Sequence, residues 1–469
     1  MTLNPVQEPV PWIKVCDHAP YFEESNGKSW TPIGQNDAIT WPDFQGLFLG
    51  RNPEQVEGHL AYLARNGVTC VRMMMEYCQT ENRYLEKPVG RFQPNMIRFW
   101  DDMFLLCRKY RIRILLTPFD TFWMARRWKY HPYNKISGGP CSSKWQWLTS
   151  PAMLEAIKIR FDFFIERYGA CGTLFGWDLW NEISPLNAGK QKEHLVSYIE
   201  KISVHIREKE TALFGKCHLQ TVSVFAPTLS RHDLADLIFR HPMLDFATTH
   251  FYDAKSIDYP KNIWTAALKT GKFVQDALNN CSADRPFLDT EHGPISYFKK
   301  HRRGLPEAFD DTYFLYMQWS HFASGGAGGG MRWPYRYPHV LTHGMRKAQL
   351  NLSQFTALID WKSFKRRNIS DAIQTSNEEI HVFGCGDKYQ AVVWLLRVET
   401  KSVGRKKVSE QPQQVLMKIP GLGEGVYEVH LWNTHHGSVD QIRIEKANGD
   451  LEIQVLLFGT NLAIAIKQC

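Results

Sequence analysis

Two glutamates stand where the sequence could support catalysis by a pair of carboxyl groups. Glu182 comes two residues after the apolar run Leu174–Trp180 ends, and Glu291 follows the apolar run Pro286–Thr290. Both runs have the length and apolar character of buried strands, so each glutamate is predicted to project from a strand end. Two facing carboxyl groups can cleave a glycosidic bond, because one protonates the leaving oxygen while the other attacks the anomeric carbon. A separation of about 5 Å gives retention through a covalent intermediate, whereas a wider gap admits a water molecule and gives inversion.

The elements that must position these glutamates are predicted from an alternation of short apolar runs and longer amphipathic runs. Mostly apolar strands that alternate with helices indicate a parallel sheet covered by helices. Eight such strands predict an α/β fold of the (β/α)8 TIM-barrel type, in which chemistry lies at the carboxyl ends of the strands. A doubly wound sheet is the alternative, but its glycine fingerprint would follow an early strand, and Gly325–Gly330 follows the seventh helix. The predicted strands are Trp30–Asn36, Val68–Met74, Ile112–Pro118, Leu174–Trp180, Leu219–Phe225, Leu244–His250, Pro286–Thr290 and Gly326–Trp333.

The last part of the chain has a different pattern. Short segments such as Val415–Ile419 and Val426–Trp432 alternate polar and apolar residues in period two, and polar turns separate them. Six or more short strands at regular spacing predict a C-terminal antiparallel β-sandwich. We therefore expect a catalytic barrel with a short N-terminal extension over residues 1–350. A linker segment and the sandwich domain are expected over residues 351–469. The segment Pro9–Lys28 predicts a hairpin over the bottom of the barrel.

The residues around both glutamates resemble the motifs of clan A retaining glycoside hydrolases. Leu179-Trp180-Asn181-Glu182 is similar to the Asn-Glu signature of that clan, in which the glutamate of the fourth strand is the acid/base. Thr290-Glu291-His292-Gly293 is similar to the nucleophile motif of the seventh strand. The resemblance extends over most of residues 20–335 and is nearest to glycoside hydrolase family 5 of the β-mannanase kind. It implies a barrel that hydrolyses β-linked sugars with retention and without a cofactor.

Residues on other strands carry the same resemblance. Arg72 lies on the second strand, where the clan has an arginine that braces the nucleophile. His250-Phe251-Tyr252 is similar to the clan's His-x-Tyr, whose tyrosine hydrogen-bonds the nucleophile. Asn36 ends the first strand, and Trp333 ends the eighth, where the clan has a sugar platform. The glycine-rich eighth strand and the insert Phe122–Ser150 depart from the pattern and leave the exact family and substrate open.

The roles can also be argued from physical chemistry. Asn181 beside Glu182 can donate a hydrogen bond to the sugar 2-hydroxyl, a contact that strengthens in the oxocarbenium-like transition state. Glu291 must be ionised to attack, and Arg72 would lower its pKa. Glu182 must hold a proton near neutral pH, which burial and the charge of Glu291 would favour. The alternatives are a structural ion pair for Arg72, a core histidine for His250 and a solvated loop acid for either glutamate alone.

An aromatic-rich stretch after the third predicted strand is our candidate for sugar-binding subsites. It includes Trp123 and Trp128, and tryptophan faces stack against the apolar faces of pyranose rings. Asp120, at the end of that strand, is predicted to contact sugar hydroxyls. Arg126 and Arg127 lie between these aromatic residues and would favour an acidic sugar. The alternative is ordinary hydrophobic packing of this segment over the barrel.

Composition and motifs exclude several other classes. The 469 residues are 43% hydrophobic and 22% charged, as in a globular protein, and 13% are aromatic. A net charge of +8 with only short basic runs argues against a nucleic-acid partner. No run approaches the roughly 18 apolar residues that a membrane helix needs. The sequence contains neither HExxH nor GxSxG, so neither a catalytic metal nor an esterase is expected.

The remaining expectations concern compartment and partners. The first residues, Met1–Trp12, lack the basic and apolar regions of a secretory signal, so we expect a cytoplasmic protein, or a secreted one if a leader has been removed. Ten dispersed cysteines without a CxxC pair suit a reducing compartment. A carbohydrate is the expected partner, and the oligomeric state stays open. A carbohydrate-binding protein without turnover and a transglycosylase are the alternative functions, and the latter would use the same residues.

Overall fold

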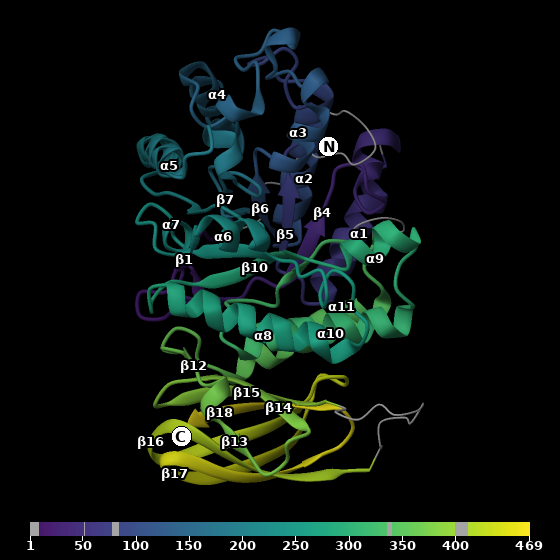
Figure 1. Ribbon diagram of the computed structural model, residues 1–469, viewed down its shortest axis with the longest axis vertical. Helices are drawn as coiled ribbons and strands as arrows, with labels where there is room; N and C mark the ends of the chain where they lie inside the picture. Colours follow the sequence, from purple (N-terminus) through teal and green to yellow (C-terminus); the bar gives the residue numbers. More distant parts are fainter. Residues whose placement is uncertain (1–8, 51, 77–83, 335–339, 399–410) are drawn as a thin grey trace.

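The computed structural model describes residues 9–50, 52–76, 84–334, 340–398 and 411–469, which form a barrel above a smaller β-structure (Figure 1). Eight parallel strands follow one another in the order β8-β7-β6-β5-β4-β11-β10-β9. Their bounds are β4 (Gly34–Asp37), β5 (Cys70–Met74), β6 (Arg113–Thr117), β7 (Leu174–Asp178), β8 (Leu219–Thr221), β9 (Ala247–Phe251), β10 (Phe287–His292) and β11 (Met331–Arg332). The barrel closes between β8 and β9, where the His250 N–H donates to the Val224 carbonyl at 3.0 Å. The predicted (β/α)8 barrel is confirmed.

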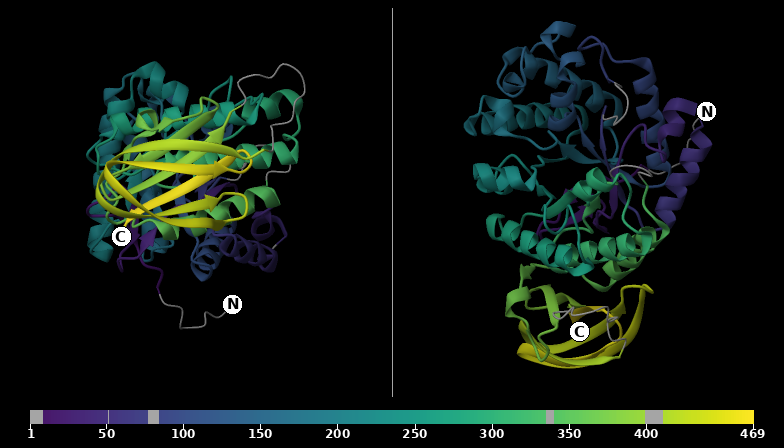
Figure 2. Two further views of the ribbon diagram at one scale, coloured as in Figure 1. Left: turned by 90° about the horizontal axis from the view of Figure 1, so that it is seen from below. Right: turned by 45° about the vertical axis from the view of Figure 1, so that its right-hand side comes forward.

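Helices surround this barrel, as the right-hand view of Figure 2 shows. The longer helices are α1 (Pro53–Arg65), α2 (Pro94–Lys109), α4 (Pro151–Tyr168), α5 (Glu193–Phe214), α8 (Ile263–Asn280), α10 (Glu307–Ala323) and α11 (His343–Phe355). Local sequence starts them: Ser150 caps α4 by accepting a hydrogen bond from the Met153 N–H, and Pro151 follows in the first turn. Between β8 and β9 lie two short helices, α6 (Ala226–His232) and α7 (Ala235–Phe239), and Asp233 between them takes a left-handed conformation that ends α6.

A small antiparallel sheet closes the amino-terminal end of the barrel, as the predicted hairpin would. It contains β1 (Ile13–Val15), β2 (Phe22–Glu24) and β3 (Ser29–Trp30). Phe22 packs edge-on against Phe175 and Phe246 inside the barrel, at ring-centroid distances of 5.2 Å and 5.5 Å. Because this end is filled by aromatic side chains, the carboxyl end of the strands is the end that is open to a ligand.

The predicted β-sandwich is confirmed, but its strands are longer than expected. It is built from β12 (Arg367–Asn368), β13 (Gln374–Thr375), β14 (Ile380–Gly386), β15 (Gln390–Arg397), β16 (Gln413–Asn433), β17 (Ser438–Leu457) and β18 (Asn461–Gln468). The segments predicted as two strands, Val415–Ile419 and Val426–Trp432, are the two halves of β16. Its pairing with β17 shifts register between Pro420 and Gly425, so the sheet bends there and folds over its own core. Figure 1 shows this unit beneath α8 and α10.

The barrel and the sandwich share a hydrophobic contact. The ring centroids of Tyr316 of α10 and Trp394 of β15 are 5.5 Å apart, and Phe383 of β14 belongs to the same buried cluster. The predicted boundary between the two domains, at residue 350, lies within α11. None of the described helices has both the length and the apolar character that crossing a membrane requires.

Candidate active site

A cavity of about 400 Å³ lies at the carboxyl end of the barrel strands. Its volume is within the range of small-molecule sites. The ends of β5 and β10 and the segments after β6, β7, β8, β9, β10 and β11 contribute side chains to it, so it is the mouth of the barrel. Its lining consists of Met74, Asp120, Phe122, Trp123, Asn181, Glu182, Phe225, Tyr252, Asp258, Glu291, Ile295, Ser296, Lys299 and Trp333.

The two predicted glutamates meet in this cavity. One carboxylate oxygen of Glu182, one of Glu291 and one ring nitrogen of His250 all lie within 4.8 Å of one another. Glu182 follows β7 with a left-handed backbone, φ +52°, and its N–H donates to the Ser223 hydroxyl at 3.2 Å. A left-handed conformation is strained for a residue other than glycine, and such strain is concentrated at functional sites.

Arg72 of β5 connects the strands beneath the cavity. Its guanidinium is fully buried and donates to Glu291 Oε2 at 3.2 Å and to Asp178 Oδ2 at 2.7 Å. It also donates to Asn36 Oδ1 at 2.8 Å and to Asn181 Oδ1 at 2.6 Å. The sequence left a structural ion pair and a contact with Glu291 as alternatives for Arg72, and this side chain makes both.

Two residues of the predicted His-x-Tyr pair contact the glutamates. The Tyr252 hydroxyl donates to Glu291 Oε1 at 2.6 Å. His250 Nδ1 lies 2.9 Å from Glu182 Oε1 and 3.6 Å from Glu291 Oε2. Burial lowers the pKa of His250 to about 4, so this imidazole is neutral at neutral pH.

The protonation of the two glutamates follows from their surroundings. Burial raises the pKa of Glu182 to about 7, although the charge of Arg72 opposes the shift. Burial also raises the pKa of Glu291, with the charge of Arg72 and the hydrogen bond from Tyr252 opposing the rise, so the lowering expected from Arg72 is outweighed. Glu291 receives hydrogen bonds from Arg72 and Tyr252, and these donors favour its ionised form. When one proton is shared by the pair, it therefore resides on Glu182.

The predicted asparagines serve different parts of the site. Asn36 lies beneath the cavity, where its amide donates to the Thr290 carbonyl at 2.9 Å and holds the strand that carries Glu291. Asn181 lines the cavity, and its amide donates to Asp120 Oδ1 at 2.6 Å. Asp120 lines the cavity as well. Burial raises the pKa of Asp120 to about 7.

The aromatic residues divide between the cavity and the protein core. Trp333 and Trp123 line the cavity, and Trp333 packs edge-on against Trp41 at 4.9 Å. Trp128 does not belong to the lining; it lies 5.0 Å from Trp147, which is fully buried. The segment predicted to form subsites therefore contributes Trp123 to the cavity, while Trp128 packs within the segment itself.

Three polar lining residues were missed by the sequence analysis. Asp258 follows β9, and Ser296 and Lys299 belong to α9 (Ile295–His301), which follows β10. Burial raises the pKa of Asp258 to about 7, and the nearby Lys299 opposes that shift. These residues lie beyond the strand ends, in segments whose path depends on tertiary packing. Their position after β9 and β10 was the available signal.

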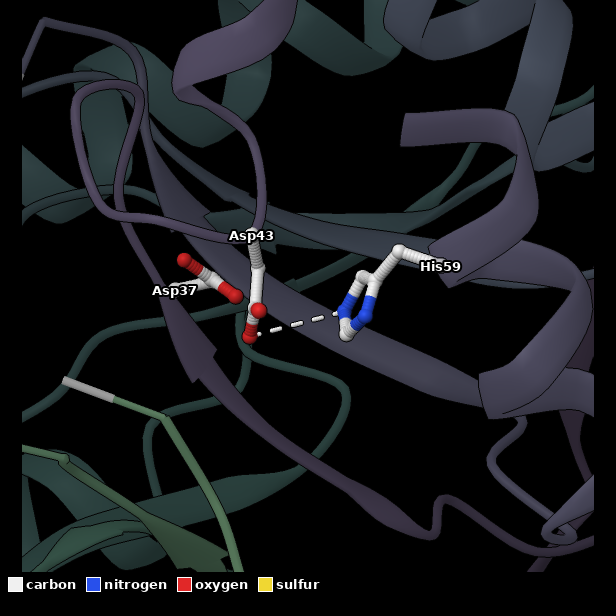
Figure 3. A group of neighbouring side chains, drawn as sticks. All are labelled: Asp37, Asp43 and His59. Carbon is white, nitrogen blue, oxygen red and sulfur yellow. Dashed lines mark ion pairs between the residues drawn. The ribbon is translucent and has the colours of Figure 1, made fainter. Parts of the chain in front are cut away.

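A second group of two carboxylates and a histidine lies outside the cavity (Figure 3). Asp37 ends β4, Asp43 follows in the loop, and His59 belongs to α1. Their ligand atoms also lie within 4.8 Å of one another, and His59 Nε2 is 3.5 Å from Asp43 Oδ2. Among the described residues, this group and the group of Glu182, His250 and Glu291 have the spacing that could hold a metal ion.

Comparison with solved structures connects this fold with known enzymes. The chain is similar to a glycoside hydrolase with a TM-score of 0.62 at 13% identity, over 98% of this chain and 99% of that one. It is similar to a glycoside hydrolase family 5 protein from Bacteroides vulgatus, with a TM-score of 0.63 at 12% identity, over 98% of this chain and 95% of that one. For a family 5 mannosidase from Rhizomucor miehei, the TM-score is 0.51 at 14% identity, over 72% of this chain and 91% of that one.

These similarities define the fold class. At such identities they establish that the chain has the fold of family 5 glycoside hydrolases, as the sequence resemblance implied. No family model matches the sequence, and no curated protein matches it.

Proposed function

We propose that this protein is a retaining β-glycoside hydrolase that cleaves a β-linked oligo- or polysaccharide by double displacement. The observation that carries the proposal is the approach of Glu182 and Glu291, whose nearest oxygens lie within 4.8 Å in the cavity. Retaining enzymes hold their carboxyl groups about 5–5.5 Å apart, whereas inverting enzymes leave about 6.5–9.5 Å for a water molecule. The narrow gap therefore favours attack by Glu291 itself.

In the first step, Glu291 attacks the anomeric carbon and Glu182 gives its proton to the glycosidic oxygen. The bond between the anomeric carbon and that oxygen breaks, and the leaving group departs as an alcohol. Arg72 and Tyr252 hold the two oxygens of Glu291 and so fix the direction of attack. The raised pKa of Glu182, about 7, supplies the proton near neutral pH.

In the second step, water attacks the anomeric carbon of the glycosyl ester. Glu182, now ionised, accepts the water proton, and the bond to Glu291 breaks. Esterification removes the charge of Glu291, so the pKa of Glu182 falls and the same residue can act as a base.

For the substrate, we propose a β-mannoside or a related β-glycoside. The proposal is supported by the resemblance of the motifs and by the fold similarity to the mannosidase from Rhizomucor miehei. Trp333 and Trp123 offer aromatic faces in the cavity against which pyranose rings can stack. Carbohydrate is accordingly the proposed partner.

The test is a panel of nitrophenyl β-glycosides, with Glu291→Ala as the inactive control. We expect turnover of at least one β-glycoside, and proton NMR of the first product should show the β-anomer. An inverted product would contradict the mechanism. Tight oligosaccharide binding without turnover would instead identify a carbohydrate-binding protein, and sugar transfer to added acceptors would identify a transglycosylase.

A further inference from the structure

Asp120 is a buried carboxylate at the boundary between the barrel and the cavity wall. It follows β6 and is 7% exposed. Its Oδ2 accepts a hydrogen bond from the Trp123 N–H and caps α3 (Thr121–Arg127), the helix that carries Phe122 and Trp123 into the cavity. Its Oδ1 accepts the hydrogen bond from the Asn181 amide at 2.6 Å. One carboxylate thus holds both a cavity wall and a polar residue of that cavity.

The orientation of the Asn181 amide is determined by its two neighbours. Arg72 can only donate, so the amide oxygen must face its guanidinium, at 2.6 Å. The amide nitrogen must then face the acceptor, Asp120. This nitrogen has a second N–H, and Asp120 is its one hydrogen-bond partner among the residues that the structure describes. Because Asn181 lines the cavity, that second N–H is available to a ligand.

Capping alone does not explain an acid at position 120. Serine, threonine or asparagine caps a helix as well as aspartate does. Burial of a carboxylate is unfavourable, which is also why the pKa of Asp120 is raised to about 7. A carboxylate differs from those neutral caps because both of its oxygens accept, so it can hold the α3 backbone and the Asn181 amide at once.

We propose that Asp120 is a positioning residue that locks the Asn181 amide and so presents its free N–H to the 2-hydroxyl of the bound sugar. The inference rests on the proposed glycosidase function and deepens it, since it explains how the site recognises one hydroxyl group of the sugar. Asp120 acts here through Asn181 rather than through its own contact with the sugar.

The test compares two substrates in the wild type and two variants. Dinitrophenyl β-mannoside and its 2-deoxy counterpart are assayed with the wild type, Asp120→Asn and Asp120→Ser, both of which keep a helix-capping residue. For the mannoside we expect kcat/KM to fall about 100-fold in Asp120→Asn, the size of a misplaced contact. For the 2-deoxy substrate, which lacks the group that Asn181 holds, kcat/KM should stay within about twofold of the wild type.

A second measurement uses Asn181→Ala alone and combined with Asp120→Asn. If Asp120 acts through Asn181, the double variant should match Asn181→Ala on the mannoside within about twofold. Equal losses on both substrates would overturn the proposal, because they would show a structural role or a direct contact with another hydroxyl. Unchanged activity on both would overturn it too. Thermal melting of each variant establishes that it is folded.

The proposed function can fail separately from this inference. Wild-type protein that cleaves no glycoside contradicts the proposed function. The role of Asp120 is then tested by calorimetry, with methyl β-mannoside and its 2-deoxy counterpart as ligands. A preference for the 2-hydroxylated sugar that disappears in Asp120→Asn supports the inference, and a preference that persists, or none in the wild type, overturns it.

Discussion

Two groups in this molecule contain the same types of side chain but differ in the hydrogen-bond donors around them. Glu182, His250 and Glu291 lie in the cavity, whereas Asp37, Asp43 and His59 lie between β4 and α1 (Figure 3). Each group consists of two carboxylates and a histidine whose ligand atoms lie within 4.8 Å. The difference is in the donors: Arg72 and Tyr252 hydrogen-bond Glu291 directly, whereas the recorded donor to Asp37 is the Ala38 N–H, at 2.7 Å.

This difference determines how a negative charge is stabilised in each group. In the second group, burial raises the pKa of Asp37 well above its usual value and that of Asp43 to about 6, and it lowers the pKa of His59 to about 3. Protonation of Asp37 therefore reduces the charge of this group, while the charge of Arg346 opposes the pKa shifts of both carboxyls. In the cavity, the donors Arg72 and Tyr252 favour a negative charge on Glu291. The same residue types are combined with hydrogen-bond donors and an open cavity around Glu291, the proposed nucleophile.

The largest expected effect is loss of the nucleophile. Glu291→Gln should lower kcat by about 10⁴-fold or more, as is found when a catalytic nucleophile is removed. Asp43→Asn, the matched amide substitution in the second group, should leave kcat/KM within about twofold, since that group lies outside the cavity. Steady-state kinetics on the best nitrophenyl substrate measures both. Comparable losses in the two variants would remove the distinction between the groups.

Loss of the acid should depend on the leaving group. Glu182→Ala removes general acid catalysis, which contributes about 10²–10⁴-fold, so activity on poor leaving groups should fall by that factor. Activity on dinitrophenyl glycosides should fall far less, because that leaving group departs without protonation. A series of aryl glycosides of graded leaving-group pKa gives the measurement. Uniform loss across the series would contradict the assignment of Glu182.

Removal of one donor should have an intermediate effect. Tyr252→Phe loses a hydrogen bond to a charged group, worth about 1.5–3 kcal/mol, and kcat/KM should fall by about 10–100-fold. The pKa of Glu291 should rise, because the donor stabilised its ionised form. The acidic limb of the pH profile of kcat/KM should therefore move to higher pH. Tyr259→Phe is the matched control, since the hydroxyl of Tyr259 pairs with His301 instead. An unmoved limb would show that the tyrosine does not tune the nucleophile.

The smallest effect concerns stability rather than activity. A carboxyl with a raised folded-state pKa stabilises the fold while protonated, and this contribution is lost as pH rises through that pKa, between about 4 and about 6 for Asp43. Asp37→Asn keeps the acceptor for the Ala38 N–H and is neutral without taking up a proton, so it should raise the free energy of unfolding at pH 7 by about 1 kcal/mol. In denaturant titrations from pH 4 to pH 8, the free energy of unfolding of this variant should fall less with rising pH than that of the wild type. A variant less stable than the wild type at pH 7 would contradict this, and exposed Asp284→Asn is the control.

The parts of the fold that sequence could predict depend on local pattern. Apolar runs such as Val68–Met74 reveal buried strands, and the barrel topology then places their ends at one mouth, so Glu182 and Glu291 could be paired in advance. Contacts between segments that are distant in the sequence have no such local pattern and could not be predicted in this way. Trp128 is a residue type that can stack on sugar rings, but it packs on Trp147. The neighbouring sequence does not distinguish it from Trp123, which lines the cavity. The path of α9, which places Lys299 in the cavity, likewise depends on tertiary contacts.

The left-handed backbone of Glu182 has a consequence for how this protein can change over evolutionary time. At φ +52°, asparagine or glycine would be less strained than glutamate. A substitution that relaxes the backbone at this position would increase stability, but it would also remove the proposed proton donor and so reduce activity. A lineage released from selection for turnover would gain stability here by losing the acid first. The barrel, its sandwich and the cavity could then persist in a more robust protein that binds sugar without cleaving it.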